Sequence, residues 1–134
     1  MKPVKVALCQ LDIAEEKAVN LSRAAELVGQ AARAQADFAI LPEMFVCPFA
    51  NCNFRPNAEE AGGTTVQFLS NLAKYHGLYL VAGSIPELSG GKVYNTSYFS
   101  AGTGRSWASI KRCTCSTPSF RTAAFTGSPT PFRQ

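Results

Sequence analysis

Residues 36–45 read ADFAILPEMF, and this stretch decides the fold. Phe38 to Leu41 form a short apolar run of strand length, and Pro42 ends it because proline has no backbone N–H to donate to a sheet. Glu43 follows at once. In open α/β sheets the carboxyl ends of the strands gather ligands and catalytic groups, so Glu43 is a candidate site residue. Taken alone, an acid that ends a strand is more often a solvated loop residue.

The chain before this stretch predicts a parallel βαβ unit. Residues 4–10 are largely apolar without a helical period, which is typical of a strand buried on both faces of a sheet. Asn20 is a candidate N-cap, and the apolar residues after it recur with helical spacing to about Gln35. A strand, a helix and a second strand in this order indicate a parallel sheet.

The chain after this stretch predicts a second helix and a hairpin on the same sheet. An irregular segment rich in Pro and Asn comes first, and Thr64 and Gln67 then form a capping-box pattern for a helix that stops at Gly77. The sequence LYLVAGS predicts a third buried strand. SGGK at residues 89–92 is turn chemistry that joins SIPEL to KVYNTSYF. The fold class is therefore α/β.

The composition indicates a globular protein, with 46% hydrophobic and 16% charged residues. The net charge of +4 comes from the end of the chain, because residues 1–99 hold eight Lys and Arg against nine Asp and Glu, whereas residues 100–134 hold five Lys and Arg and no acid. This distribution argues against a nucleic-acid partner. Without a leader or an apolar run of roughly 18 residues, we expect no membrane span and a cytoplasmic protein.

The cysteines predict reduced thiols rather than disulfides or a metal site. Five cysteines are present, an odd number without framework spacing. Cys113 and Cys115 lie too close together, and lack the further ligands, for a convincing metal site. We expect no metal and no cofactor.

The order of several segments resembles the nitrilase, or carbon–nitrogen hydrolase, superfamily. VALCQLDI, ADFAILPEMF, AEEAGGTTVQFL, LYLVAGSIPE and GKVYNT follow one another as they do in that family, and the resemblance covers residues 4–99. The branch it most resembles is the omega-amidase-like one, which hydrolyses the amide of small dicarboxylic acid monoamides. The resemblance implies an α-β-β-α sandwich, of which this chain holds an incomplete, N-terminal part, and a homo-oligomeric assembly.

The resemblance also implies a catalytic triad of Glu, Lys and Cys. A carboxylate takes the proton of the thiol and passes it to the leaving amine, and an ammonium stabilises the oxyanion. By the motif match Glu43 is the general base. The family's nucleophilic Cys lies beyond the end of this chain, and its Lys belongs to a K-x-H-L-F-D segment where this chain has IKRCTCST, so Lys111 is a candidate by position alone.

Three other residues with reactive side chains have plainer interpretations. Cys9 lies inside the first strand and Cys47 lies four residues after Glu43, and both are expected to be ordinary apolar or loop residues rather than nucleophiles. His76, next to Gly77, is expected to serve the end of its helix.

Residues 100–134 are interpreted as an out-of-frame tail. Arg112 to Thr117 can be written AGA TGC ACC TGT TCG ACN, and from the last base of the first codon this gives M-H-L-F-D, the segment that the family carries. Shifted codons on both sides also permit family segments at family spacing. We therefore expect one lost base, or two gained, near the codons of residues 98–100. A segment with twelve Ser or Thr and five unpaired positive charges should be disordered.

The sequence thus predicts two units, a partial carbon–nitrogen hydrolase domain at 1–99 and a disordered tail at 100–134. The family's substrate is a small-molecule amide or nitrile, but a chain without the nucleophile should be inactive. The alternative is a non-catalytic α/β binding or interaction module that pairs with another subunit through an exposed sheet. A basic tail that binds nucleic acid is disfavoured because the tail lacks interleaved aromatic residues.

Overall fold

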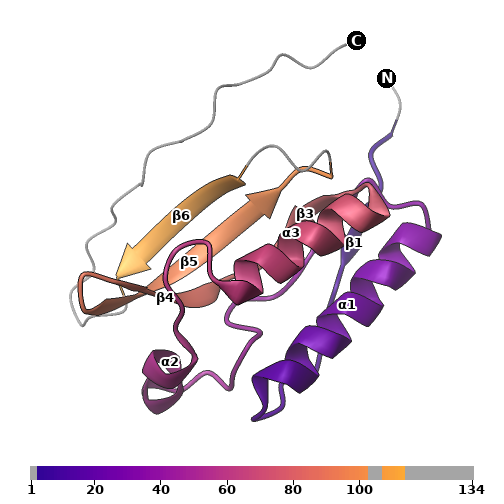
Figure 1. The fold of residues 1–134 in the computed structure, drawn as a ribbon. Coiled ribbons are helices and arrows are strands. Elements are labelled where there is room, and N and C mark those ends of the chain that lie inside the picture. The colour runs from indigo at the N-terminus through magenta and orange to yellow at the C-terminus, as the bar shows by residue number, and fades with distance from the viewer. Residues whose placement is uncertain (1–2, 103–106, 114–134) are drawn as a thin grey trace.

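The fold is one mixed sheet with two long helices on one of its faces (Figure 1). The computed structural model describes residues 3–102 and 107–113. Its elements, in chain order, are β1 Val6–Leu8, α1 Lys17–Arg33, β2 Phe38–Ile40, α2 Asn51–Asn57, α3 Thr64–His76, β3 Tyr79–Val81, β4 Ile85–Ser89, β5 Lys92–Ser100 and β6 Trp107–Cys113. The predicted α/β class is confirmed.

Strands β1, β2 and β3 are parallel, as the βαβ pattern predicts. The core lies between this sheet and the two helices, where Ala39 and Leu80 are fully buried beneath α1 and α3. The expectation that the first strand is buried on both faces was wrong, because Val6 and Leu8 are 50% and 78% exposed. The described helices cover only one face, so every second residue of this edge strand meets solvent.

The predicted hairpin is confirmed, and it belongs to a longer ribbon. β4 and β5 are antiparallel and are joined at Gly90 and Gly91, both of which have positive φ. β3 pairs with the far end of β5, at Phe99 and Ser100, on the edge that β4 also uses. β3 and β4 therefore act as one strand with an interruption at residues 82–84.

Two predicted helix caps are wrong, and tertiary contacts explain both. α1 begins three residues before Asn20, whose side chain is fully buried and bonded to other segments. α3 has Gly63 as its N-cap, and the Thr65 N–H is capped at 2.8 Å by the Glu59 carboxylate instead of by a capping box. The predicted stop at Gly77 is confirmed, with φ +65°. The segment expected to be irregular contains the short helix α2.

Glu59 joins α1 to α3. Its carboxylate accepts hydrogen bonds from the Lys17 ammonium and from the Thr65 hydroxyl and backbone N–H. Burial by itself would raise the pKa of Glu59, but the bonds from Lys17 and Thr65 outweigh it, so the pKa is lowered. This carboxylate is therefore a structural group that holds the helix layer together.

The structure differs from the predicted disorder at part of the tail. β6 pairs antiparallel with β5 over seven residue pairs, from Ser100 opposite Trp107 to Tyr94 opposite Cys113. Residues 107–113 therefore belong to the sheet. Residues 100–102 are also described, and the rest of the predicted tail, including Cys115, lies outside the described residues. The assignment of residues 100–134 to a different reading frame concerns the DNA and stays a prediction.

Candidate functional site

Glu43 lies on the loop that leaves β2 at the carboxyl end of the parallel strands. The chain is still in the sheet at Leu41, whose N–H donates to the carbonyl of Val81 at 2.9 Å. Glu43 itself is exposed, whereas the next four residues, 44–47, are buried. Met44 adopts a left-handed backbone conformation with φ +50°, so the chain turns sharply after the glutamate. The predicted position of Glu43 at a strand end is confirmed.

Gly83 allows this loop to approach the sheet. Gly83 has φ +55°, and a Cβ placed on it would lie 1.9 Å from the carbonyl oxygen of Pro42 and 2.7 Å from that of Leu41. No side chain fits in that space, so the interruption between β3 and β4 requires glycine. The neighbouring Ser84 accepts a hydrogen bond from the Met44 N–H through its Oγ at 3.0 Å. These two residues fix the backbone on both sides of Glu43.

Asn95 on β5 contacts the Glu43 carboxylate directly. Its Nδ2 donates to Glu43 Oε1 at 2.6 Å, and the residue is only 8% exposed. Because a carboxylate only accepts hydrogen bonds, this contact fixes which end of the carboxamide faces Glu43. The Asn95 Oδ1 is then turned away from the carboxylate, buried, and without a hydrogen-bond partner among the described residues.

Asn20 holds the end of the same loop from α1. Its Nδ2 donates to the carbonyls of Ala14 at 2.8 Å and Val46 at 3.2 Å, and its Oδ1 accepts from the Ala14 N–H at 2.8 Å. All the contacts are to backbone groups, and the side chain is fully buried. The loop after β2 is thus held from α1, from the β3–β4 interruption and from β5.

The predicted cation lies on β6, beside the strand that carries Asn95. In the backbone register Lys111 lies opposite Thr96, and the residue opposite Asn95 is Arg112. Residues directly opposite one another in an antiparallel pair are cross-strand neighbours, about 5 Å apart. Lys111 and Arg112 therefore lie on the strand next to Asn95, the residue that holds Glu43. The role of Lys111 stays a prediction.

The two cysteines considered as nucleophiles are core residues. Cys9 is 6% exposed and Cys47 is 1% exposed. Burial raises the pKa of both thiols, so the reactive thiolate is disfavoured. His76 closes the last turn of α3, where its ring packs against Tyr75 at 4.9 Å between centroids. These placements agree with the plainer interpretations.

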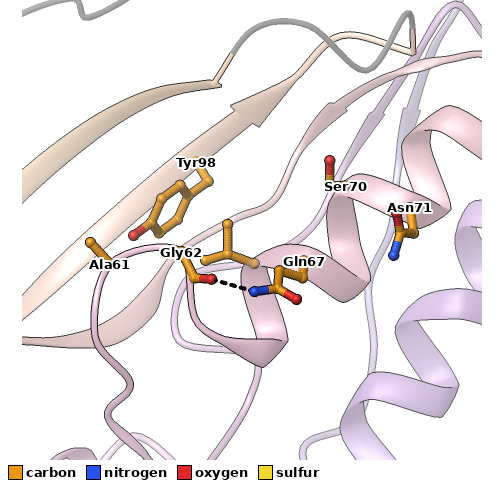
Figure 2. Close-up of a pocket in the computed structure, with 7 residues that line it drawn as sticks. Ala61, Gly62, Gln67, Ser70, Asn71 and Tyr98 are labelled. Carbon is orange, nitrogen blue, oxygen red and sulfur yellow. Dashed lines mark hydrogen bonds between the residues drawn. The ribbon is translucent and has the colours of Figure 1, made fainter.

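A cavity of about 560 Å³ lies on the helix side of the sheet (Figure 2). It is bordered by the start of α3, by the loop before it and by β5, through Ala61, Gly62, Val66, Gln67, Ser70, Asn71 and Tyr98. The Tyr98 hydroxyl donates to the buried Glu87. Burial and the neighbouring Glu87 carboxylate raise the pKa of Tyr98, so it stays a neutral donor.

This cavity is separate from the Glu43 site. Side chains alternate between the two faces along β5, so Tyr98 and Asn95 belong to opposite faces of the sheet. Within residues 3–102 and 107–113, no three His, Cys, Asp or Glu side chains gather as metal ligands would. The helices found in the same residues are too short or too polar to cross a membrane.

Sequence reasoning missed the residues that position Glu43. Asn95 stands in the VYNT segment that was matched to a family, but nothing in the local pattern ties an amide on a strand to an acid 52 positions earlier. Asn20 was interpreted as a helix cap, the commonest local use of asparagine. Gly83 in VAGS gave a usable signal, because a glycine inside a strand pattern often marks a close approach of another backbone.

Comparisons with known proteins give one consistent family. The profile described as "Carbon-nitrogen hydrolase" matches residues 5–112. Omega-amidase NIT2 of Danio rerio is 46% identical over 96 residues, which are 72% of this chain and 35% of that protein, and the Mus musculus omega-amidase NIT2 is 43% identical over the same length. The chain therefore spans about a third of the curated relatives that it matches.

Solved structures agree. Saccharomyces cerevisiae Nit3, described as a member of branch 10 of the nitrilase superfamily, is similar with a TM-score of 0.79 and 31% identity, over 93% of this chain and 52% of that chain. A CN-hydrolase superfamily protein from Xanthomonas campestris is similar with a TM-score of 0.74 and 25% identity, over 84% of this chain and 41% of that chain.

The close approach at Gly83 gives a stability prediction with a matched control. Gly83→Ala should lower the free energy of unfolding by about 2–4 kcal/mol, because it adds a steric clash with Pro42 to the cost of a positive φ. Gly90→Ala should lower it by only about 1 kcal/mol, since Gly90 has a similar φ of +56° and nothing within 4 Å of the added Cβ. Urea unfolding of both variants measures the difference, and equal losses would contradict the assignment.

Proposed function

Because this chain belongs to the carbon–nitrogen hydrolase family over residues 5–112, we propose that its residues serve the hydrolysis of a small-molecule amide. The identity of 46% to an omega-amidase supports a short ω-amide, the monoamide of a small dicarboxylic acid, as the substrate class. A nitrile is a less favoured substrate because the Danio rerio and Mus musculus relatives are both omega-amidases.

The observation that supports this most directly is the hydrogen bond between Asn95 and Glu43. A general base must hold one carboxylate oxygen toward the proton that it removes, and the bond of 2.6 Å to Oε1 fixes the orientation of the carboxyl group. Glu43 is exposed, so a reactant can reach it. In the proposed reaction Glu43 takes a proton from the attacking thiol and returns it to the departing ammonia.

The cation for the oxyanion would come from β6. Lys111 is the candidate, and Arg112 is the residue opposite Asn95 in the register. A positive group here would stabilise the negative charge that develops on the carbonyl oxygen during attack. Arginine presents a planar fork where lysine presents a compact point charge, so the two are not equivalent in this role.

We also propose that the 134-residue chain does not turn over. The family's nucleophile lies beyond the matched region, and the buried thiols of Cys9 and Cys47 have raised pKa values, which leaves little thiolate at neutral pH. Incubation of the chain with a dicarboxylic acid monoamide should release no more ammonia than the Glu43→Gln variant does. Release that is faster than in Glu43→Gln would contradict the proposed inactivity.

The second part of the proposal concerns the origin of residues 100–134. The match to the omega-amidases covers 96 residues, and the family profile continues to residue 112. We propose that the codons from about residue 100 are translated one base out of the ancestral frame.

The coding DNA tests this origin. In the alternate frame, the codons across residues 95–134 should encode M-H-L-F-D at Arg112 to Thr117, and a longer open frame should follow. An alternate frame that has stop codons or lacks H-L-F-D would contradict the proposal, and residues 100–134 would then be read in their ancestral frame.

A further inference from the structure

The cavity between α3 and β5 is not used by the Glu43 site, because it lies on the other side of the sheet (Figure 2). Its volume of about 560 Å³ is within the range of small-molecule binding sites. One side of α3 contributes four of the residues that line it, on two successive turns: Val66, Gln67, Ser70 and Asn71. The cavity is therefore a candidate for a second binding site.

The cavity has an apolar floor and a polar rim. Val66 and Tyr98 are 4% and 6% exposed, so the valine methyl groups and the tyrosine ring form the deep part. Gln67 and Asn71 are exposed, and Ser70 is half-buried. A ligand that fits this surface buries a flat apolar part against the ring and keeps its polar group near the opening.

The rim can form hydrogen bonds but carries no charge. The Ser70 hydroxyl and the Asn71 carboxamide have no hydrogen-bond partner among the described residues. Gln67 donates from Nε2 to the Gly62 carbonyl at 3.0 Å, which leaves its Oε1 able to accept. Hydroxyl and carboxamide groups can bond to both the N–H and the C=O of an amide. A carboxylate or an ammonium would lose hydration here without meeting an opposite charge.

The wall of the cavity is already in place without a ligand. The loop before α3 is fixed by the Glu59 carboxylate, which accepts from the Thr65 N–H at 2.8 Å and from the Thr65 hydroxyl. The bond between Gln67 and Gly62 ties the same loop to the first turn of the helix. A preformed site spends little free energy on ordering its own groups when a ligand binds.

We propose that this cavity binds an uncharged aromatic carboxamide. The ring would lie against Tyr98 and Val66, and the amide would bond to Ser70 and Asn71 at the rim. The substrate proposed for the Glu43 site carries a carboxylate, so it does not suit this cavity. The inference therefore concerns a second site and does not depend on amide hydrolysis.

Benzamide, titrated into the ¹⁵N-labelled 134-residue chain, tests the proposal in ¹H–¹⁵N correlation spectra. The shifts should be concentrated at residues 61–71 and at Tyr98, with a dissociation constant on the order of 1–10 mM, as expected for so small a ligand. Benzoate has nearly the same shape and a negative charge, and it should bind roughly tenfold more weakly or not at all.

Two tryptophan variants test the location of the site. Ser70→Trp should abolish the shifts, because its indole would fill the cavity. Phe68→Trp is the matched control and should bind benzamide as the wild type does, since Phe68 lies on α3 but does not line the cavity. Far-UV circular dichroism checks that each variant is folded, and Asn71→Trp replaces Ser70→Trp if that variant does not fold.

Four results would overturn the proposal. The first is the absence of shifts at about 10 mM benzamide, well into the expected binding range. The second is a set of shifts centred on Glu43 and Asn95, which would place benzamide on the other side of the sheet. The third is benzoate binding as tight as that of benzamide. The fourth is unchanged binding in a folded Ser70→Trp variant.

Discussion

The contact between Gly83 and the backbone of Pro42 is the constraint on which the candidate site depends. The missing Cβ lets the loop after β2 lie against the β3–β4 interruption, where an alanine methyl group would be 1.9 Å from the Pro42 oxygen. With the loop in that place, Ser84 can hold the Met44 N–H and Asn95 can reach Glu43. Loss of the close approach would break both contacts, so one glycine links the topology of the sheet to its chemistry.

The two faces of the sheet have different roles. The helix face holds the hydrophobic core, and tertiary contacts such as those of Glu59 between α1 and α3 hold its helices together. The other face has the stacked aromatic row. Asn95 belongs to this face because side chains an even number of positions apart on a strand, such as Asn95 and Phe99 on β5, point to the same side. Any layer packed on this face would therefore also lie beside Asn95 and Glu43. Water would be excluded from the carboxylate, and in such an environment electrostatic interactions are stronger.

The sequence predicted those features that arise from local chemistry. Apolar runs, the double glycine at 90–91 and the glycine stop at 77 identified the βαβ unit, the hairpin and the end of α3, and the proline after Leu41 placed Glu43 at a strand end. Features that depend on distant partners were not predictable. Asn20 and Thr65 bond across the fold instead of capping their own helices, and Asn95 meets an acid from a different strand. β6 was missed because residues 107–113 were assigned to a basic tail rich in Ser and Thr, although an edge strand needs only a neighbour with free backbone groups.

The central claim is that Asn95 holds the Glu43 carboxylate at the carboxyl end of the parallel strands. The side-chain amide protons of Asn95 test it directly in ¹H–¹⁵N correlation spectra of the labelled chain. We expect the Asn95 proton that faces Glu43 to exchange slowly with water and to lose that protection in Glu43→Ala, with the backbone spectrum otherwise preserved. Asn95 amide protons that exchange as fast as those of an exposed asparagine, or that do not respond to Glu43→Ala, would contradict the account.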